Sequence, residues 1–85
     1  MKQYTIVFAP QAKKQIEGLS SKVKIRIANS LDALSLDPHL GKALKADLRG
    51  LYSYRVGDYR IIYSIIRNKL VIQIIKVMHR RDAYR

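Results

Sequence analysis

The chain has 85 residues, which leaves room for one domain, residues 1–85, with a small core. It carries 17 Lys and Arg against 6 Asp and Glu, a formal net charge of +11, and no Cys, so the core must form without disulfides, as suits a reducing cytoplasm. No apolar run approaches the length needed to cross a bilayer, and the charge favours nucleic acid or the ribosome as partner over a merely soluble cationic surface or a membrane surface.

The chain is predicted to begin with a strand and a short helix. Residues 3–8 are rich in β-branched and aromatic types, which favour a strand. Pro10 follows where the first turn of a helix tolerates proline, and Gly18 closes that helix.

A second, longer helix is predicted next. Ser20 or Ser21 offers its N-terminal cap, Asp37-Pro38 ends it, and residues 39–43 are predicted to be a loop. Its apolar residues recur at spacings of four, four and three and form one buried stripe: Val23, Ile27, Leu31 and Leu34.

The C-terminal half changes to a period of two, which is typical of strands. Its apolar runs cover residues 44–48, 52–56, 59–66 and 70–78. They are separated by short turn segments: Gly50, Gly57-Asp58 and Asn68-Lys69. Turns this short join antiparallel neighbours, so we expect an α+β domain of order β-α-α-β-β-β-β, with the N-terminal strand and both helices packed on an antiparallel meander.

The Gly57-Asp58 turn predicts a pair of facing arginines. A two-residue loop sets Val56 opposite Tyr59 and therefore Arg55 opposite Arg60. Like charges directly opposite each other destabilise a sheet, and an anion bound by both arginines would relieve the repulsion. Two alternatives stay open: the two guanidinium groups can point away from each other into solvent, and a bulge at Gly57 would shift the register.

The last strand and the C-terminus add positive charge to the same region. A turn at Asn68-Lys69 sets Ile66 opposite Val71 and carries Val77 alongside Arg60. Residues 42–85 hold 11 basic and 3 acidic side chains. They end in HRRDAYR, whose cationic and aromatic residues are suited to binding phosphates and stacking on bases. The alternative is a frayed basic tail.

The residue types leave few chemistries. We expect no metal site and no cofactor, because Cys is absent and His39 and His79 lie far apart, and no serine sits in a nucleophile elbow. What remains is phosphodiester cleavage in which RNA supplies its own 2′-hydroxyl and arginines stabilise the charge. His79 is the candidate for proton transfer, although it can equally be an ordinary surface histidine.

Three segments together resemble the RelE family of the RelE/ParE toxin superfamily: Leu48-Arg49-Gly50, YRVGDYRIIY at residues 54–63, and VMHRRDAY at residues 77–84. The resemblance covers essentially the whole chain. It implies a cytoplasmic toxin of a type II toxin-antitoxin system, an mRNA interferase that enters the ribosomal decoding site, cuts codons by 2′-hydroxyl attack and so inhibits translation. It also implies a RelB-like antitoxin as partner, with promoter DNA bound only through the antitoxin complex.

The resemblance also implies roles for individual residues. Arg60 matches the family arginine that stabilises the scissile phosphate, Arg80 matches the arginine after the last strand, and Tyr84 matches the base-stacking tyrosine. The chain departs from the family where two strand lysines stand, because Ser53 and Arg55 occupy those positions.

Arg55 can hold phosphate but is a poor base, so either His79 takes the proton or the enzyme works by orientation and charge. Other cations are expected to bind RNA and the ribosome: Lys45, Arg49, Arg81 and Arg85. A ParE-like inhibitor of DNA gyrase and a non-catalytic nucleic-acid-binding relative are the alternative functions.

Overall fold

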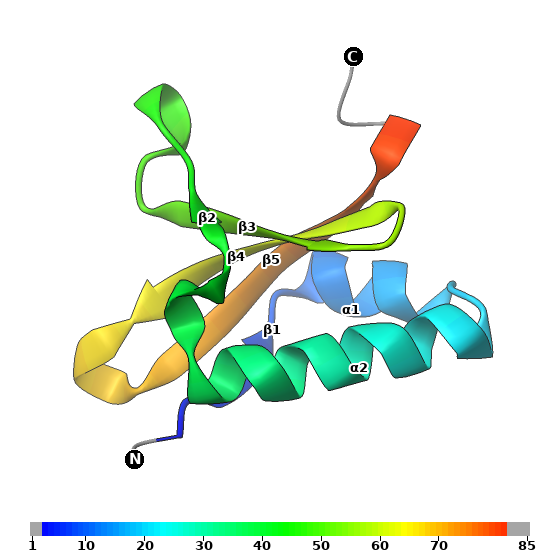
Figure 1. The fold of residues 1–85 in the computed structure, drawn as a ribbon, viewed down its shortest axis with the longest axis horizontal. Helices are drawn as coiled ribbons and strands as arrows, with labels where there is room; N and C mark the ends of the chain where they lie inside the picture. Colours follow the sequence, from blue (N-terminus) through cyan, green and yellow to red (C-terminus); the bar gives the residue numbers. More distant parts are fainter. Residues whose placement is uncertain (1–2, 82–85) are drawn as a thin grey trace.

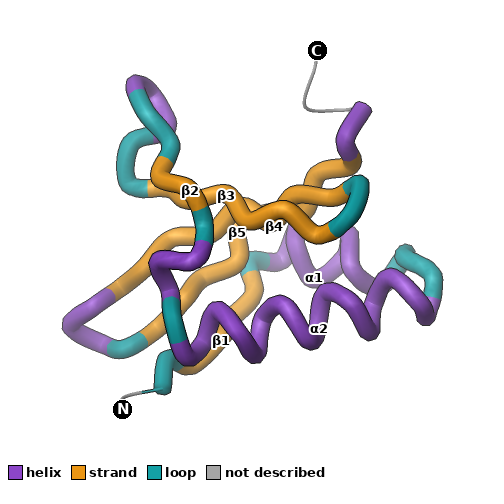
Figure 2. Tube along the Cα trace, viewed as in Figure 1, coloured by secondary structure: helices purple, strands orange, loops and turns teal. Residues whose placement is uncertain are grey.

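A computed structural model describes residues 3–81 as two layers, with both helices on one face of a five-stranded sheet (Figures 1 and 2). The helices and strands are β1 (Thr5–Phe8), α1 (Pro10–Glu17), α2 (Ser21–Leu36), β2 (Lys42–Ala43), β3 (Leu51–Val56), β4 (Tyr59–Ile66) and β5 (Val71–His79). Three single-turn 3-10 helices connect them: η1 (Pro38–Leu40), η2 (Ala46–Leu48) and η3 (Arg67–Lys69). The predicted α+β class and the order β-α-α-β-β-β-β are confirmed.

The strand order across the sheet is β1-β5-β4-β3-β2. The meander from β2 to β5 is antiparallel throughout, whereas β1 lies parallel to β5. The two helices carry the chain from the β1 edge to the β2 edge and cover one face on the way (Figure 1). No helix within residues 3–81 is both long enough and apolar enough to cross a membrane.

The helices form where the sequence predicts them. The Ser20 hydroxyl caps α2 by accepting a hydrogen bond from the Val23 N–H at 3.3 Å. The α2 stripe is buried at Ile27, Leu31 and Leu34. It packs on the helix-facing side of the sheet, where four residues are fully buried: Ile61, Tyr63, Ile72 and Ile74.

The strand predicted at residues 44–48 is wrong. The strand that pairs with β3 consists of Lys42 and Ala43, which the sequence predicts to be a loop, and one further hydrogen bond runs from the Leu44 N–H to the Leu51 carbonyl oxygen at 2.9 Å. Ala46–Leu48 instead forms a 3-10 turn. The apolar character of this segment has a different cause: Leu44 and Leu48 lie over the face of the sheet that the helices leave open, where they line a hollow with Ile62. Ile62 is only 6% exposed, although it points away from the helices.

The register of β5 also differs from the prediction. Ile66 does face Val71, as expected, but the register shifts by one residue between Ile62 and Tyr63, and Arg60 therefore pairs with Met78 rather than with Val77. The extra residue is Ile75 on β5, because Ile62 pairs with Lys76 and Tyr63 with Ile74. A bulge of this kind turns every following side chain to the other face.

The turn before β5 is longer than expected. Instead of a two-residue turn at Asn68-Lys69, the chain makes the η3 turn and then a left-handed residue, Leu70, with φ of 53°.

α1 covers the part of the β5 edge that β1 does not reach. β1 ends opposite Ile74, and beyond this point the Gln15 side chain of α1 accepts a hydrogen bond from the Val77 N–H at 2.8 Å. An edge amide that would otherwise lack a protein partner is thereby satisfied. The arrangement holds the last part of β5, which leads to Arg80.

Candidate functional site

The predicted arginine pair is present on the open face of the sheet. Val56 pairs with Tyr59 and Arg55 with Arg60, so the hairpin has the two-residue loop and no bulge at Gly57. Directly paired residues point to the same face, and this face is opposite to that of buried Val56. The Arg55 Nε–H donates to the Gly57 carbonyl oxygen at 3.1 Å, which fixes that side chain near the turn.

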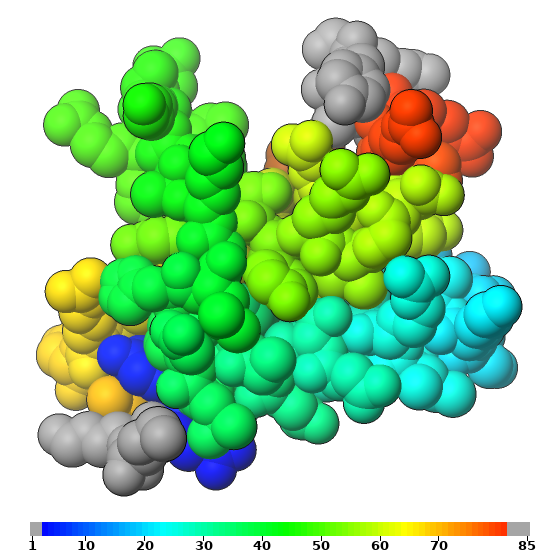
Figure 3. Space-filling view, viewed as in Figure 1, coloured from blue at the N-terminus to red at the C-terminus, as the bar shows by residue number. Residues whose placement is uncertain are grey.

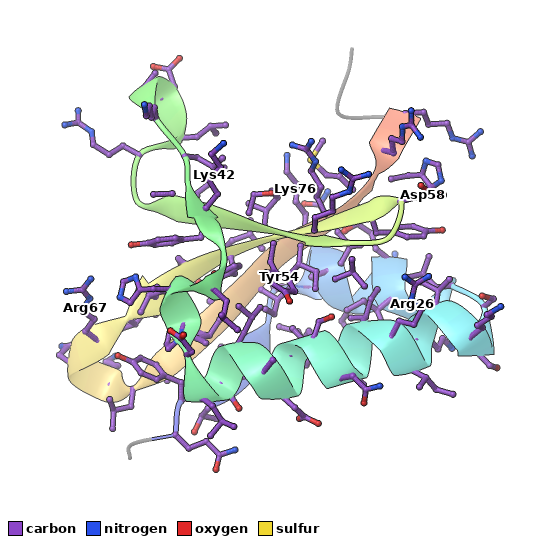
Figure 4. The ribbon with its side chains drawn as sticks, in the orientation of Figure 1. Arg26, Lys42, Tyr54, Asp58, Arg67 and Lys76 are labelled. Carbon is purple, nitrogen blue, oxygen red and sulfur yellow. The ribbon has the colours of Figure 1, made fainter. Side chains whose placement is uncertain are left out.

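Gly57 is required in this turn for two reasons. Its φ of +59° is left-handed, and a Cβ at this position would lie 3.0 Å from a guanidinium nitrogen of Arg26. Arg26 projects from α2, so the helix layer packs against the same turn that sets the arginine pair (Figure 4).

Arg80 joins the pair although it is 20 residues further along the chain than Arg60. Its backbone N–H donates to the Asp58 carbonyl oxygen at 2.6 Å and ties the end of β5 to the hairpin turn. The result is a pocket of about 190 Å³ whose lining includes Arg55, Arg60 and Arg80 together with residues 57–59. This is smaller than the roughly 300–1,000 Å³ of sites that hold whole cofactors, and three guanidinium groups suit it to one phosphate group.

A second hollow adjoins the first and shares both arginines of the pair. It lies where β2 leaves β3 and is lined by Leu40, Lys42, Leu44, Ser53, Tyr54, Arg55 and Arg60. Figure 3 shows the space between the segment that projects at residues 42–50 and the β3–β4 hairpin. The arginine pair therefore lines both a mainly polar pocket and a hollow that also contains Leu40 and Leu44.

Sequence reasoning missed two lysines on this face, Lys42 and Lys76. Both project from the side of the sheet opposite to the helices (Figure 4). Lys42 pairs with Ser53 and Lys76 with Ile62, which puts them on the face of Arg60. Lys76 was detectable as the one charged residue between positions 71 and 78, whereas Lys42 was hidden in the predicted loop.

His79 lies on the other face. It pairs with Tyr59, and the two rings meet edge to face with centroids 5.0 Å apart. Its Nδ1 accepts a hydrogen bond from the Arg81 N–H at 3.3 Å. The bulge at Ile75 explains this placement, because without the extra residue His79 would share the face of Arg60. The structure does not bring His79 into either hollow that the arginine pair lines.

The remaining predicted site residues lie around this face or outside the described part. Lys45 and Arg49 are exposed on the segment that projects around η2, and Arg81 is exposed after β5. Tyr84 and Arg85 fall outside residues 3–81. Within that range, no three His, Cys, Asp or Glu side chains gather into a metal site.

Buried Tyr63 anchors the projecting segment to the sheet. Its hydroxyl donates to the Pro38 carbonyl oxygen at 2.7 Å and accepts from the Gly41 N–H at 3.0 Å. Its ring stacks on Tyr52 with centroids 5.5 Å apart. Burial raises the pKa of Tyr63 to about 12, so the hydroxyl keeps its proton and its donor role. These bonds fix the residue that precedes Lys42.

Comparison with known proteins places these features in a family context. The sequence pattern of the family described as "ParE toxin of type II toxin-antitoxin system, parDE" matches residues 6–84. The chain is 32% identical to toxin RelG of Mycobacterium tuberculosis over 84 residues, 96% of this chain and 97% of that protein. It is 33% identical to toxin RelE of the same organism over 84 residues, 96% of this chain and 87% of that protein.

A solved structure agrees with these matches. The toxin-antitoxin complex RelBE2 from Mycobacterium tuberculosis contains a chain that superposes with a TM-score of 0.85 at 30% sequence identity. The superposition covers 92% of this chain and 99% of that chain.

Proposed function

Since this chain belongs to the RelE/ParE family of type II toxin-antitoxin toxins, we propose that it is a ribosome-dependent endoribonuclease that cuts mRNA codons in the decoding site. The observation that carries the proposal is the small pocket on the open face, which Arg55, Arg60 and Arg80 line together. Three arginines outnumber the one acidic residue, Asp58, that lines the same pocket, and a bound anion would relieve the repulsion between the arginines.

In the proposed reaction the RNA 2′-hydroxyl attacks the neighbouring phosphorus. The new O–P bond forms, the bond to the 5′-oxygen breaks, and the products are a 2′,3′-cyclic phosphate and a 5′-hydroxyl that takes its proton from water. Arg60 contacts the phosphorane and offsets the charge that develops on it. Arg55 and Arg80 hold the phosphate so that the attacking 2′-oxygen, the phosphorus and the leaving 5′-oxygen lie in one line.

The roles outside the pocket remain predictions. Tyr84 is proposed to stack on a base of the codon, and exposed cations are proposed to contact ribosomal RNA: Lys45, Arg49, Arg81 and Arg85. The proposed place of action is the cytoplasm, where translation occurs. The proposed partner is a RelB-like antitoxin, since the similar RelBE2 structure is a toxin-antitoxin complex. We also propose that promoter DNA is bound only through the complex with the antitoxin.

A ParE-like action on DNA gyrase is the second candidate, which the description of the matching family favours. Two observations favour the ribonuclease instead: the relatives at 32% and 33% identity bear RelE-type names, and the arginines surround a pocket small enough for a single phosphate. A relative that only binds nucleic acid would not need several arginines around one small pocket.

Mapping of RNA ends tests the proposal. The purified toxin is incubated with ribosomes that carry a short mRNA with a defined codon in the decoding site, and the RNA ends are sequenced. Cuts inside that codon that require the ribosome support the ribonuclease. Intact RNA together with inhibited supercoiling by gyrase supports the ParE-like action, and neither effect supports the non-catalytic relative.

A further inference from the structure

We propose that the second hollow beside the arginine pair is a nucleobase site, which receives one base of the RNA whose phosphate the arginines hold. The inference rests on the proposed ribonuclease function and goes beyond it, because it assigns the residues that select the base. The hollow has a volume of about 390 Å³, against about 190 Å³ for the phosphate pocket. This is within the range of roughly 300–1,000 Å³ that is typical of sites for small molecules.

The floor of the hollow adjoins the arginine pair along one strand. Ser53 and Arg55 are two residues apart on β3, so their side chains leave the same face of the sheet about 7 Å from each other. Arg60 faces Arg55 across the hairpin and lines both the hollow and the phosphate pocket. A phosphate held by the two arginines therefore brings the base of its own or the next nucleotide over Ser53.

The walls of the hollow suit the flat, apolar faces of a base. Leu40 and Leu44 line it from the two sides of β2. Leu40 is 47% exposed, so the core makes little use of its apolar surface. Sites that hold a base outside its stack enclose it between aromatic or apolar side chains. The two leucines can supply this contact.

The polar groups of the hollow are mainly hydrogen-bond donors. The Lys42 ammonium and both guanidinium groups can only donate, whereas the Ser53 hydroxyl can donate or accept. Within residues 3–81, the lining of this hollow includes no acidic side chain. A base edge with carbonyl oxygens fits such a lining, whereas an edge with an amino group would face other donors. We therefore expect the hollow to prefer guanine and uracil to adenine and cytosine.

Hydrogen bonds hold the backbone on both sides of Lys42. On one side the Gly41 N–H donates to the Tyr63 hydroxyl at 3.0 Å, and on the other the Leu44 N–H donates to the Leu51 carbonyl oxygen at 2.9 Å. A wall that is fixed before the ligand arrives costs little ordering when the ligand binds. The segment around Lys42 is therefore suited to selecting one base over another.

The other hollow near Leu44 is a poorer place for a base. Among residues 3–81, its lining includes Lys76 but neither arginine of the pair. A base in that hollow would have no phosphate held beside it. The shared arginines thus favour the hollow over Ser53 as the base site.

The first test fills the hollow with Ser53→Leu, which leaves the net charge unchanged. Ser64→Leu is the matched control, because Ser64 pairs with Leu51 on the same face but does not line the hollow. Single-turnover cleavage is measured on ribosomes whose mRNAs differ in one base of the codon in the decoding site. We expect the parent to cut the preferred bases roughly tenfold faster, and Ser53→Leu to lose this preference together with about tenfold in rate. Ser64→Leu should behave as the parent.

Two further variants separate the polar and apolar parts of the site. Lys42→Met keeps an apolar stem but removes the donor, so the preferred bases should be cut as slowly as the others, while Lys24→Met on exposed α2 changes nothing. Leu40→Ala should slow the cutting of every base by about fivefold. Its control is Leu36→Ala, which shortens another exposed leucine and should leave the rate unchanged. Urea unfolding of each variant checks that the fold is intact.

A binding measurement without the ribosome tests the site independently of cleavage. The protein is titrated with a dinucleotide that 2′-O-methyl groups protect from cutting, and with an analogue that lacks the bases. Chemical shifts of the backbone amides are followed by NMR. We expect base-dependent shifts at Leu40, Leu44 and Ser53, and shifts near the arginines with both compounds.

Three outcomes would overturn the site: equal shifts with and without the bases, the parental base preference in Ser53→Leu, and cleavage unchanged in both Ser53→Leu and Leu40→Ala while inhibition by an antitoxin is lost. The last outcome would mean that the hollow holds an apolar side chain of a protein partner. If the parent cuts no RNA but the base-dependent shifts occur, the base site is supported and the proposed function fails.

Discussion

Arg55 and Arg60 face each other across the β3–β4 hairpin, and both line the same two hollows. Two positive side chains in direct cross-strand positions repel each other and weaken the hairpin by some tenths of a kcal/mol. The fold tolerates this repulsion at the one place where a phosphate is proposed to bind. Activity and stability should therefore oppose each other at this pair.

The first prediction is that Arg55→Glu stabilises the protein and abolishes cleavage. The change replaces a repulsive cross-strand pair by an attractive one and also removes the exposed Arg55 hydrogen bond to Gly57, so the net rise in the free energy of unfolding should be about 0.5 kcal/mol. It also puts a carboxylate into the phosphate pocket. Urea unfolding and the ribosome cleavage assay measure the two effects, with Lys69→Glu as the control for net charge. A variant that is less stable than the control would contradict the prediction.

The arginine pair could be predicted because a two-residue turn fixes its register locally. Gly57-Asp58 is read from the sequence, and the pairing of Arg55 with Arg60 follows from it without any knowledge of the rest of the fold. The confirmed stripe on α2 is local in the same sense, because it depends only on helical period.

The side of the sheet on which His79 lies could not be predicted, since it depends on one extra residue. The bulge at Ile75 is a property of how β5 meets both β4 and α1, and no turn residue marks it. Similarly, the leucines at positions 44 and 48 resemble strand residues, but they cover the open face instead. Their true role depends on packing between segments, which a periodic pattern does not contain.

The second prediction concerns Tyr63→Phe. The change leaves the Pro38 carbonyl and the Gly41 N–H without their buried partner, which should lower the free energy of unfolding by about 1–3 kcal/mol. Tyr54→Phe is the control, because its hydroxyl makes no side-chain hydrogen bond within residues 3–81. Equal urea midpoints for the two variants would show that the anchor contributes nothing.

The third prediction is that the difference in stability between the parent and Tyr63→Phe depends on pH. Tyrosine in an unfolded chain titrates near pH 10, whereas the pKa of folded Tyr63 is about 12. A raised pKa means that the fold binds the neutral form more strongly, so this stability is complete below about pH 10 and is lost as the pH rises toward 12. The stability difference between parent and Tyr63→Phe should therefore shrink across that window. A stability difference that stays constant from about pH 10 to about pH 12 would refute the raised pKa of Tyr63.

The fourth prediction is that Gly41→Ala and Tyr63→Phe are not additive. A Cβ at position 41 would overlap the Tyr63 hydroxyl and lie 2.9 Å from ring carbons Cε1 and Cζ. We expect Gly41→Ala to cost about 1–3 kcal/mol in the parent and less, but not nothing, in Tyr63→Phe, where only the ring carbons remain. A double-mutant cycle from urea unfolding measures the coupling, and additive costs would show that the two residues do not meet.

The last prediction is that Arg60→Ala slows cleavage far more than it weakens ribosome binding. Arg60 lines both hollows and is proposed to act on charge that exists only in the transition state, so its loss should cost about 3–4 kcal/mol, or roughly 10²–10³ in single-turnover rate. Binding draws on all 17 basic side chains and should fall steeply with salt for parent and variant alike, because phosphate contacts release counterions. Removal of one cation then changes affinity only slightly, as the control Lys24→Ala, which removes an exposed cation from α2, should show on its own. Parental cleavage by Arg60→Ala would remove the basis of the proposed site, whereas an equal loss in binding and rate would make Arg60 a substrate-holding residue.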